Sequence, residues 1–256
     1  MNVWDLFSVK GEVAVVTGGG RGLGRAMAEA LGEAGARLVI ASRKLEQVEE
    51  TAEFFRSQGI EVLAAPLDVS SPNDVEALMN RVRKHFGRID ILINNSGASW
   101  GAPSLEMPLE AWRKVMEVNV QGTFLMSQYA ARIMKDQGGG RIINMASIAG
   151  LAGSDPEVLD AAGYSASKGA IVAMTRDLAR KWARWNIRVN AIAPGFFPTK
   201  MSAGVIQHHG DRLLQGTPLQ RFGTMEDIKG IALLLASRAS AYMTGAIVVV
   251  DGGASA

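Results

Sequence analysis

The sequence predicts an α/β protein whose core is one doubly wound, seven-stranded parallel sheet with helices on both faces. Short apolar runs rich in Val, Ile and Leu recur along the chain, and segments with helical spacing separate them. Runs without polar alternation are typical of strands buried on both faces. Alternation of strands and helices favours right-handed crossovers, which make the strands parallel. The expected strands span residues 13–17, 38–41, 62–67, 89–94, 141–145, 187–192 and 247–250.

The segments between these runs have the apolar spacing of helices that pack against a sheet. The clearest stripes are Leu23, Ala26, Met27, Ala30 and Leu31, and then Val75, Leu78, Met79, Val82 and Phe86. Three consecutive glycines at 138–140 predict the end of a helix and a turn. A long excursion rich in proline and glycine follows residue 194, and we expect it to form a substrate lid at about 196–222.

The composition predicts a single domain and excludes several kinds of chemistry. No repeat or Pro/Gly-rich linker divides the chain, so we expect residues 1–256 to form one domain. The formal charge of +2 gives no electrostatic argument for a nucleic-acid or membrane partner. Because the chain has no cysteine, it has no disulfide, thiolate zinc site or cysteine nucleophile.

The N-terminal residues lack the basic start and continuous apolar stretch of a signal peptide, so we expect a cytoplasmic location. The longest apolar runs are far shorter than the roughly 20 residues that span a bilayer. The histidines, His85, His208 and His209, do not have the spacing of metal ligands. We therefore expect no catalytic metal.

A glycine-rich turn, TGGGRGLG at residues 17–24, lies between the first expected strand and the first expected helix. Glycines let the backbone approach a phosphate, and a helix N-terminus supplies N–H donors and a favourable dipole. The spacing differs from the G-x-G-x-x-G fingerprint, and such a turn alone also fits a plain tight turn. The residues expected to bind a dinucleotide here are Gly18, Arg21, Gly22, Leu23 and Gly24.

The end of the second expected strand favours NADP(H) over NAD(H). An acidic residue there would hold the ribose hydroxyls of NAD, whereas an arginine accommodates the 2′-phosphate of NADP. The chain has Ser42 and Arg43 at this point, and the nearest acid, Glu46, belongs to the next helix. The guanidinium groups of Arg43 and Arg21 suit a phosphate. The alternative is that Arg43 only solvates the start of a helix.

Tyr164 and Lys168 are separated by one helical turn, which places both side chains on the same face of a helix. A free tyrosine titrates near pH 10, and a neighbouring cation stabilises its phenolate. We therefore expect Lys168 to lower the pKa of Tyr164 and make it a general acid–base. Alone, the pair also fits an ordinary amphipathic helix with a surface lysine.

Together these motifs make the chain resemble the short-chain dehydrogenase/reductase family from Thr17 to Gly253. The resemblance rests on residues 17–24, Asp68-Val69, Asn94-Asn95-Ser96-Gly97, Asn119, Ser147, Tyr164 with Lys168, Pro194-Gly195 and Asp251-Gly252-Gly253. It implies a Rossmann fold and a nicotinamide cofactor, here NADP(H). The further cofactor-binding residues that it implies are Asp68 and Val69 near the adenine, Asn95, Ser96 and Gly97 along the cofactor, and Pro194, Gly195, Phe197 and Thr199 around the nicotinamide.

The resemblance also implies a catalytic tetrad of Asn119, Ser147, Tyr164 and Lys168. Ser147 would hold the substrate oxygen, and Tyr164 would exchange the proton as hydride is transferred between the nicotinamide and carbon. Lys168 would also hold the nicotinamide ribose, and Asn119 would anchor a water that supplies protons. Read singly, Ser147 also fits a helix cap and Asn119 a buried polar residue with local partners.

Two substrate classes fit this resemblance: 3-oxoacyl thioesters, including carrier-linked ones, and gluconate-type or keto-sugar substrates. The expected pocket and lid residues are apolar and favour an acyl chain; they are Trp100, Met107, Phe196, Phe197, Met201, Val205 and Ile206. They also fit lid packing or a subunit contact. Sixteen residues, 148–163, separate Ser147 from Tyr164, more than is usual in the family, and Asp155, Glu157 and Asp160 among them would repel a sugar acid if they faced the pocket.

The expected partners follow from the same resemblance. In carrier-linked reductases two arginines bind the acidic acyl carrier protein; Arg132 matches the first position, but Trp185 occupies the second. A homotetramer is implied, formed by the helix after Tyr164 and the preceding helical segment, 112–134. Ile171, Met174, Leu178, Trp182 and Trp185 form an apolar stripe there, which the monomer core also explains in part. A cofactor-binding regulatory protein is the alternative from another class, and the intact tetrad speaks against it.

Overall fold

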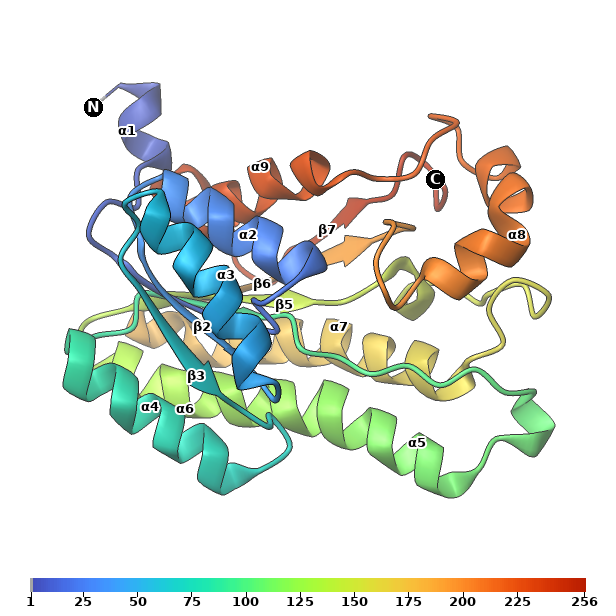
Figure 1. Ribbon diagram of the computed structural model, residues 1–256, viewed down its shortest axis with the longest axis horizontal. Helices are drawn as coiled ribbons and strands as arrows, with labels where there is room; N and C mark the ends of the chain where they lie inside the picture. Colours follow the sequence, from blue (N-terminus) through green and yellow to red (C-terminus); the bar gives the residue numbers. More distant parts are fainter. Residues whose placement is uncertain (1) are drawn as a thin grey trace.

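A computed structural model describes residues 2–256 (Figure 1). All seven expected strands form one parallel sheet in the order β3-β2-β1-β4-β5-β6-β7. Their bounds lie within two residues of those expected. The strands are β1 (Val13–Thr17), β2 (Arg37–Ser42), β3 (Val62–Pro66), β4 (Ile91–Asn94), β5 (Gly140–Met145), β6 (Ile187–Pro194) and β7 (Ile247–Val250). The predicted doubly wound fold is confirmed.

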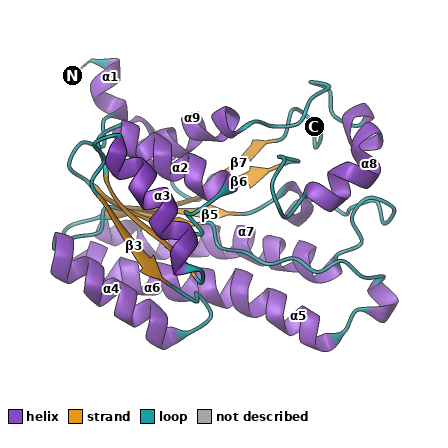
Figure 2. Ribbon diagram, in the orientation of Figure 1, coloured by secondary structure: helices purple, strands orange, loops and turns teal. Residues whose placement is uncertain are grey.

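Helices cover both faces of the sheet (Figures 1 and 2). The helices are α1 (Val3–Phe7), α2 (Gly22–Glu33), α3 (Leu45–Ser57), α4 (Pro72–Phe86), α5 (Leu109–Met116), α6 (Gly122–Asp136), α7 (Ala162–Trp182), α8 (Ala203–Gln215) and α9 (Met225–Ala236). Short helical turns are η1 (Ser104–Glu106), η2 (Glu117–Gln121), η3 (Ile148–Gly150), η4 (Ala183–Trp185) and η5 (Arg238–Ser240). Helices α2, α3 and α9 pack on one face, whereas α4, α6 and α7 pack on the other.

The apolar strand sequences are explained by burial on both faces. Every residue of β1 is buried; Ala14 and Val16 belong to the core under α2 and α9, and Val13 and Val15 to the core under α4 and α6. Side chains alternate across a strand, so a strand between two helical layers needs apolar residues at every position.

The strand order reverses at β1, which pairs with β2 on one side and with β4 on the other. The crossovers that leave β1 and β4 therefore run in opposite directions, and a crevice opens at the carboxyl ends of these strands. Thr17 ends β1 and Asn94 ends β4. The sequence motifs that follow these two strands are thus brought to one place.

Buried polar side chains connect the strands at this edge to the helices behind them. Asn94 donates to Ser127 Oγ at 2.8 Å and to Asn144 Oδ1 at 2.9 Å, and Asn144 donates to Thr175 Oγ1 at 3.0 Å. This chain of hydrogen bonds joins β4 and β5 to α6 and α7. Because buried polar groups are costly when unpaired, it fixes how the helices sit on the sheet.

The apolar stripe of α7 packs largely inside this one chain. Ile171 and Leu178 are buried, and Met174, Trp182 and Trp185 pack in part against the core. The contribution of this stripe to an interface between copies is therefore smaller than the sequence pattern suggests. Among residues 2–256, no helix combines the length and the apolar character that crossing a membrane requires.

Candidate active site

A cavity of about 1420 Å³ lies at the carboxyl edge of the sheet. Every residue predicted to bind the cofactor or to act in catalysis lines it, except Asn119. The glycine-rich turn, the ends of β2, β3, β4, β5 and β6, the start of α7 and the segment 196–222 all contribute to it. Residues spread over the chain from Gly18 to Thr199 thus form one site, as parallel strands with a common edge require.

The glycine-rich turn requires glycine at specific positions. Gly18 and Gly22 have φ values of +66° and +52°, in the left-handed region that favours glycine. A Cβ on Gly24 would lie 2.3 Å from the carbonyl oxygen of Gly18, closer than any side chain tolerates. The turn therefore presents bare backbone and the N-terminus of α2 to the cavity, and this cradle fits a pyrophosphate.

Side chains of β1 and β4 hold this turn in place. Thr17 Oγ1 accepts hydrogen bonds from the backbone N–H groups of Asn95, at 2.9 Å, and Ser96, at 3.0 Å. In return, Asn95 Nδ2 donates to the carbonyl oxygens of Thr17 and Gly18. Asn95 and Ser96, predicted only to lie along the cofactor, therefore also position the loop that would bind it.

The part of the cavity at the end of β2 fits the adenosine part of NADP(H). Ser42, Arg43 and Lys44 line it at the end of β2, and no acid stands among them. Asp68 lies nearby, and hydrogen bonds from Ser70, more than any other effect, lower the pKa of its carboxyl group. Asp68 is thus held as a carboxylate facing the adenine region, while Arg43 offers a guanidinium to a 2′-phosphate.

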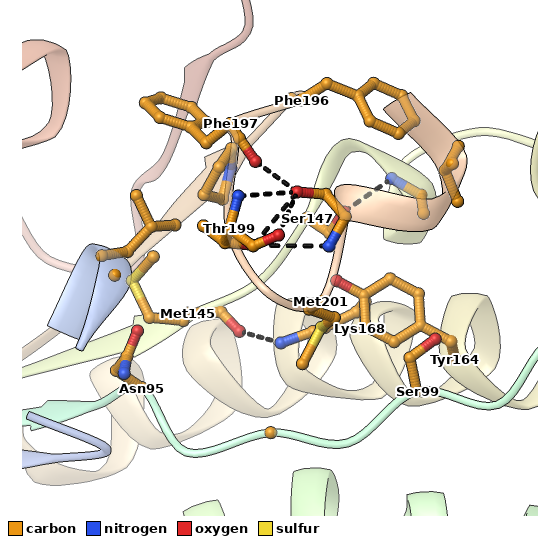
Figure 3. A pocket seen from close by; sticks show the side chains of 18 of the residues that line it. Asn95, Ser99, Met145, Ser147, Tyr164, Lys168, Phe196, Phe197, Thr199 and Met201 are labelled. Carbon is orange, nitrogen blue, oxygen red and sulfur yellow. Dashed lines mark hydrogen bonds between the residues drawn. The ribbon is translucent and has the colours of Figure 1, made fainter. Parts of the chain in front are cut away.

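Lys168 enters the site from α7 and is buried. Its Nζ donates a 2.6 Å hydrogen bond to the carbonyl oxygen of Met145 in β5, and it lies 5.5 Å from the centre of the Tyr164 ring (Figure 3). Burial disfavours the charged ammonium and lowers the pKa of Lys168 to about 8. The lysine can therefore exchange protons close to neutral pH.

The Tyr164 phenol is also buried, and burial raises its pKa above the usual value of 10.0. A hydrogen bond with Ser147 acts in the opposite direction and is the smaller effect. The expectation that Lys168 lowers the pKa of Tyr164 is wrong for this structure, because burial of the phenol is the larger effect. The ammonium of Lys168 donates to the Met145 carbonyl, and burial lowers its own pKa. The phenol therefore stays protonated at neutral pH and holds a proton that can be transferred.

Ser147 caps a helical turn, as one interpretation of the sequence predicted, and it also lines the cavity where its catalytic role is predicted. Its hydroxyl oxygen accepts from the N–H of Ala149 and so begins the short turn η3. This bond uses a lone pair of the oxygen and leaves the hydroxyl proton for one acceptor, either the Tyr164 oxygen or a carbonyl oxygen. Ser147 and Tyr164 can therefore both direct an O–H group at one carbonyl oxygen.

Asn119 lies behind the cavity in η2, where it is fully buried. Its Oδ1 accepts from the N–H of Ala98 at 2.7 Å, and its Nδ2 donates to Ala98 O and to Ser167 Oγ, both at 2.9 Å. The side chain thus has the local partners of a buried polar residue and connects the loop after β4 to α7. Its predicted role in holding a water remains a prediction.

The apolar residues expected around the substrate divide into two groups. Phe196, Met201 and Val205 line the cavity, whereas Trp100 is 52% exposed and Met107 and Ile206 do not line it. Phe197 lines it but is 3% exposed and belongs to the core, with its ring against Gly223. The site is therefore less apolar than the sequence pattern predicted.

Several lining residues carried no sequence signal. The polar and charged ones are Lys44, Gln47, Ser99, Ser154, Lys200, Ser202, Arg212, Thr217 and Ser255. They lie on loops, at the start of α3 and on α8, outside any motif, and only the folded chain brings them to the cavity. Among residues 2–256, no group of three or more His, Asp or Glu side chains is placed to hold a metal ion.

The fold and the paired phenol and ammonium define a dinucleotide-dependent oxidoreductase, and comparison with known proteins gives its family. Residues 18–255 match the family model described as Enoyl-(Acyl carrier protein) reductase. The 5-keto-D-gluconate 5-reductase of Escherichia coli K12 is 36% identical over 251 residues, which are 97% of each chain. The chain belongs to the short-chain dehydrogenase/reductase family, and the predicted resemblance is confirmed.

Two further comparisons bear on cofactor and substrate. The chain is 35% identical to a gluconate 5-dehydrogenase of Burkholderia cenocepacia solved with NADP and tartrate, with a TM-score of 0.94 over 99% of this chain and 98% of the other. It is 34% identical to a 3-oxoacyl-[acyl-carrier-protein] reductase of Aquifex aeolicus over 246 residues, 96% of this chain and 98% of the other. These findings support NADP(H), the predicted cofactor.

Replacing Tyr164 with Phe removes the transferable proton and keeps the ring, so turnover is expected to fall by about 10²- to 10⁴-fold. Affinity for NADPH should stay within about two-fold of wild type, measured by fluorescence titration. Tyr242→Phe is the matched control, because Tyr242 is fully exposed. Near-full activity of Tyr164→Phe would remove this residue from the mechanism.

Arg43→Asp is expected to shift cofactor preference from NADP(H) toward NAD(H), because the carboxylate repels a 2′-phosphate and accepts from free ribose hydroxyls. The measurement is the ratio of the two cofactor affinities. Arg81→Asp makes the same charge change on an exposed position that does not line the cavity. If wild type binds NADH as tightly as NADPH, the assignment fails.

Lys168 is expected to make stability depend on pH. Its pKa is 10.5 in an unfolded chain and about 8 when buried, so its contribution to the free energy of unfolding rises between pH 8 and 10.5. The free energy of unfolding of Lys168→Met should therefore exceed that of wild type by the largest margin below pH 8. This difference should shrink by on the order of 3 kcal/mol toward pH 10.5. Denaturant unfolding of the cofactor-free protein at several pH values measures it. Lys181→Met, exposed on the same helix, should show no such trend.

Proposed function

We propose that this protein is an NADP(H)-dependent oxidoreductase that interconverts a ketone and a secondary alcohol on a sugar acid of the gluconate type. Its support is the match, over nearly the whole chain, to enzymes named for gluconate derivatives, one of them solved with NADP and a hydroxy acid. The 3-oxoacyl-thioester substrate that the sequence first favoured has weaker support, and the sugar-acid alternative takes its place.

In this mechanism Ser147 and Tyr164 bind the carbonyl oxygen and the phenol transfers its proton to that oxygen. Bound NADPH supplies the hydride. Because burial raises the pKa of Tyr164, the phenol stays protonated until an oxyanion develops beside it. Lys168, with its pKa lowered to about 8, can then return a proton to the tyrosine. Oxidation of the alcohol uses the same groups in reverse.

The carboxylate of the substrate requires a cation near this pair. A smaller hollow of about 470 Å³ adjoins the main cavity, and Arg21, Ser99, Lys200 and Met201 line both. Neither Arg21 nor Lys200 forms an ion pair among the described residues. Lys200 therefore offers an uncompensated positive charge at the entrance, and we assign it to the substrate carboxylate.

Of the three acidic residues in the loop after Ser147, Asp160 lines the smaller hollow beside Lys200, and the other two are paired with a cation. Asp155 lines the cavity, but Asp155 and Glu157 both form ion pairs with Arg212. The single positive charge of Arg212 offsets one of their two negative charges. The repulsion that the sequence suggested is thereby reduced.

The carrier-protein alternative has only part of the surface it needs. Arg132 is exposed on α6 and stacks over Tyr129 at 4.9 Å. At the second position Trp185 stands where a cation is required, although the guanidinium of Arg184 lies over its ring at 4.4 Å. The apolar lining by Phe196, Met201 and Val205 still suits an acyl chain.

Lys200→Gln is expected to raise the KM for 5-keto-D-gluconate roughly five- to ten-fold with little change in kcat, because one charge-assisted hydrogen bond is lost. The KM of a neutral polyhydroxy ketone should not change, which separates charge recognition from damage to the site. The assay follows NADPH oxidation, with acetoacetyl thioester in parallel. Turnover of the thioester and none of the sugar acid would contradict the proposed function.

We also propose a homotetramer in the cytoplasm. Leu109 on α5 and Phe124 on α6 leave apolar side chains exposed on the helices that the family resemblance assigns to the interface. Light scattering of the purified protein measures the assembly.

A further inference from the structure

Helix α8 lies over the cavity but has little to hold it there. None of its residues is buried, although Val205, Arg212 and Leu213 line the cavity. The backbone leaves helical geometry at His209, which is followed by Gly210, so α8 consists of two short pieces. Elements with few buried contacts open at low free-energy cost.

Hydrogen bonds order both ends of the segment that contains α8, and one of them ties its second end to the loop after β7. At its start the N–H of Thr199 donates to Ser202 Oγ at 3.0 Å, and the Ser202 hydroxyl donates to the carbonyl of Phe197. At its end the N–H of Leu219 donates to Gly252 O at 3.1 Å. Helix α8 lies between these ordered ends and can move over the cavity as a lid.

Arg212 alone carries the polar side-chain contacts between α8 and a distant part of the described chain. Its guanidinium pairs with the carboxylates of Asp155 and Glu157, on the loop between Ser147 and Tyr164. Figure 1 shows this loop and α8 side by side at the same end of the molecule. Arg212 and Asp155 line the cavity and Glu157 does not, so the ion pairs join the two elements along the wall of the cavity.

The loop is built to present these carboxylates. Asp155 Oδ1 accepts from the N–H of Glu157, and Asp155 O accepts from the N–H groups of Val158 and Leu159. This turn orders the loop and directs both acids toward α8. The long loop between Ser147 and Tyr164 thus has a structural role, which is to place two carboxylates next to Arg212.

We propose that Arg212 is the latch of this lid: its ion pairs to Asp155 and Glu157 hold α8 closed over the site, and their breakage lets substrate and cofactor enter and leave. Arg212 is a positioning residue, which acts through α8 on the closure of the cavity. The inference does not depend on which carbonyl compound is the substrate.

The position of the latch at the surface fixes its physical character. The side chains of Arg212, Asp155 and Glu157 are 51%, 41% and 73% exposed. Exposed pairs are weak individually and are screened by salt. The latch should therefore open readily, and high salt should open it as well.

The test compares Arg212→Ala, the double variant Asp155→Asn/Glu157→Gln, and all three substitutions together. Asparagine keeps the oxygen that orders the loop. Two rates are measured: amide hydrogen exchange of residues 203–215 in the cofactor-free protein, and NADPH release by stopped-flow fluorescence. Lys181→Ala is the matched control, because it removes an exposed ion pair with Asp177 on α7, away from the cavity.

Removing either Arg212 or the two carboxylates should increase both rates about two- to five-fold, the range typical of an exposed ion pair. The combined variant should gain no more than either change alone, since both remove the same interaction. Raising NaCl to about 1 M should speed exchange of α8 in wild type and not in the variants. Three results would each overturn the proposal. Arg212→Ala could keep wild-type rates, the effects of Arg212→Ala and Asp155→Asn/Glu157→Gln could add in the combined variant, or the faster exchange could spread over the whole chain.

Discussion

A lysine ammonium buried against a strand carbonyl holds the catalytic part of this structure together. The bond from Lys168 to Met145 joins α7 to β5, and at the preceding residue of the helix Asn119 joins Ser167 to the loop after β4. Tyr164 is on the same helix, so its position relative to Ser147, which follows β5, depends on these contacts. A buried ammonium opposes folding at neutral pH. The site thus keeps a group that stability alone would not select, as is common in active sites.

The cavity has one firmly held side and one loosely held side. On the cofactor side, hydrogen bonds among Thr17, Asn95 and the glycine-rich turn are part-buried and join two neighbouring strands. On the substrate side, α8 has no buried residue and its polar contacts with distant segments come from the exposed Arg212. A rigid cofactor site and a movable cover suit an enzyme that must exclude water during transfer and release product afterwards.

The fold was predictable from the sequence because each strand is a local signal. In a sheet covered on both faces, burial demands continuous apolar runs, and the bounds of β1 and β7 were predicted to the residue. The site residues were predictable for a similar reason, since motifs such as 17–24 directly follow strands that share one edge. What failed depends on three-dimensional neighbours. The pKa of Tyr164 was expected to fall, whereas the burial created by the fold raises it, and the pairing of Arg212 with Asp155 joins residues that no local pattern relates.

The choice between substrate classes shows why residue type is a weaker guide than residue placement. Apolar residues near the predicted lid suggested an acyl chain, yet Phe197 packs in the core and Trp100 is largely exposed. The acids of the loop suggested repulsion of a sugar acid, yet Arg212 pairs with two of them and offsets one of their charges. Once these residues are assigned to packing and to the lid, the charged groups left around the smaller hollow are two cations, Lys200 and Arg21, and one acid, Asp160. An anionic substrate gains from such a hollow before any contact with the catalytic pair, because the net positive charge raises its local concentration and orients its carboxylate.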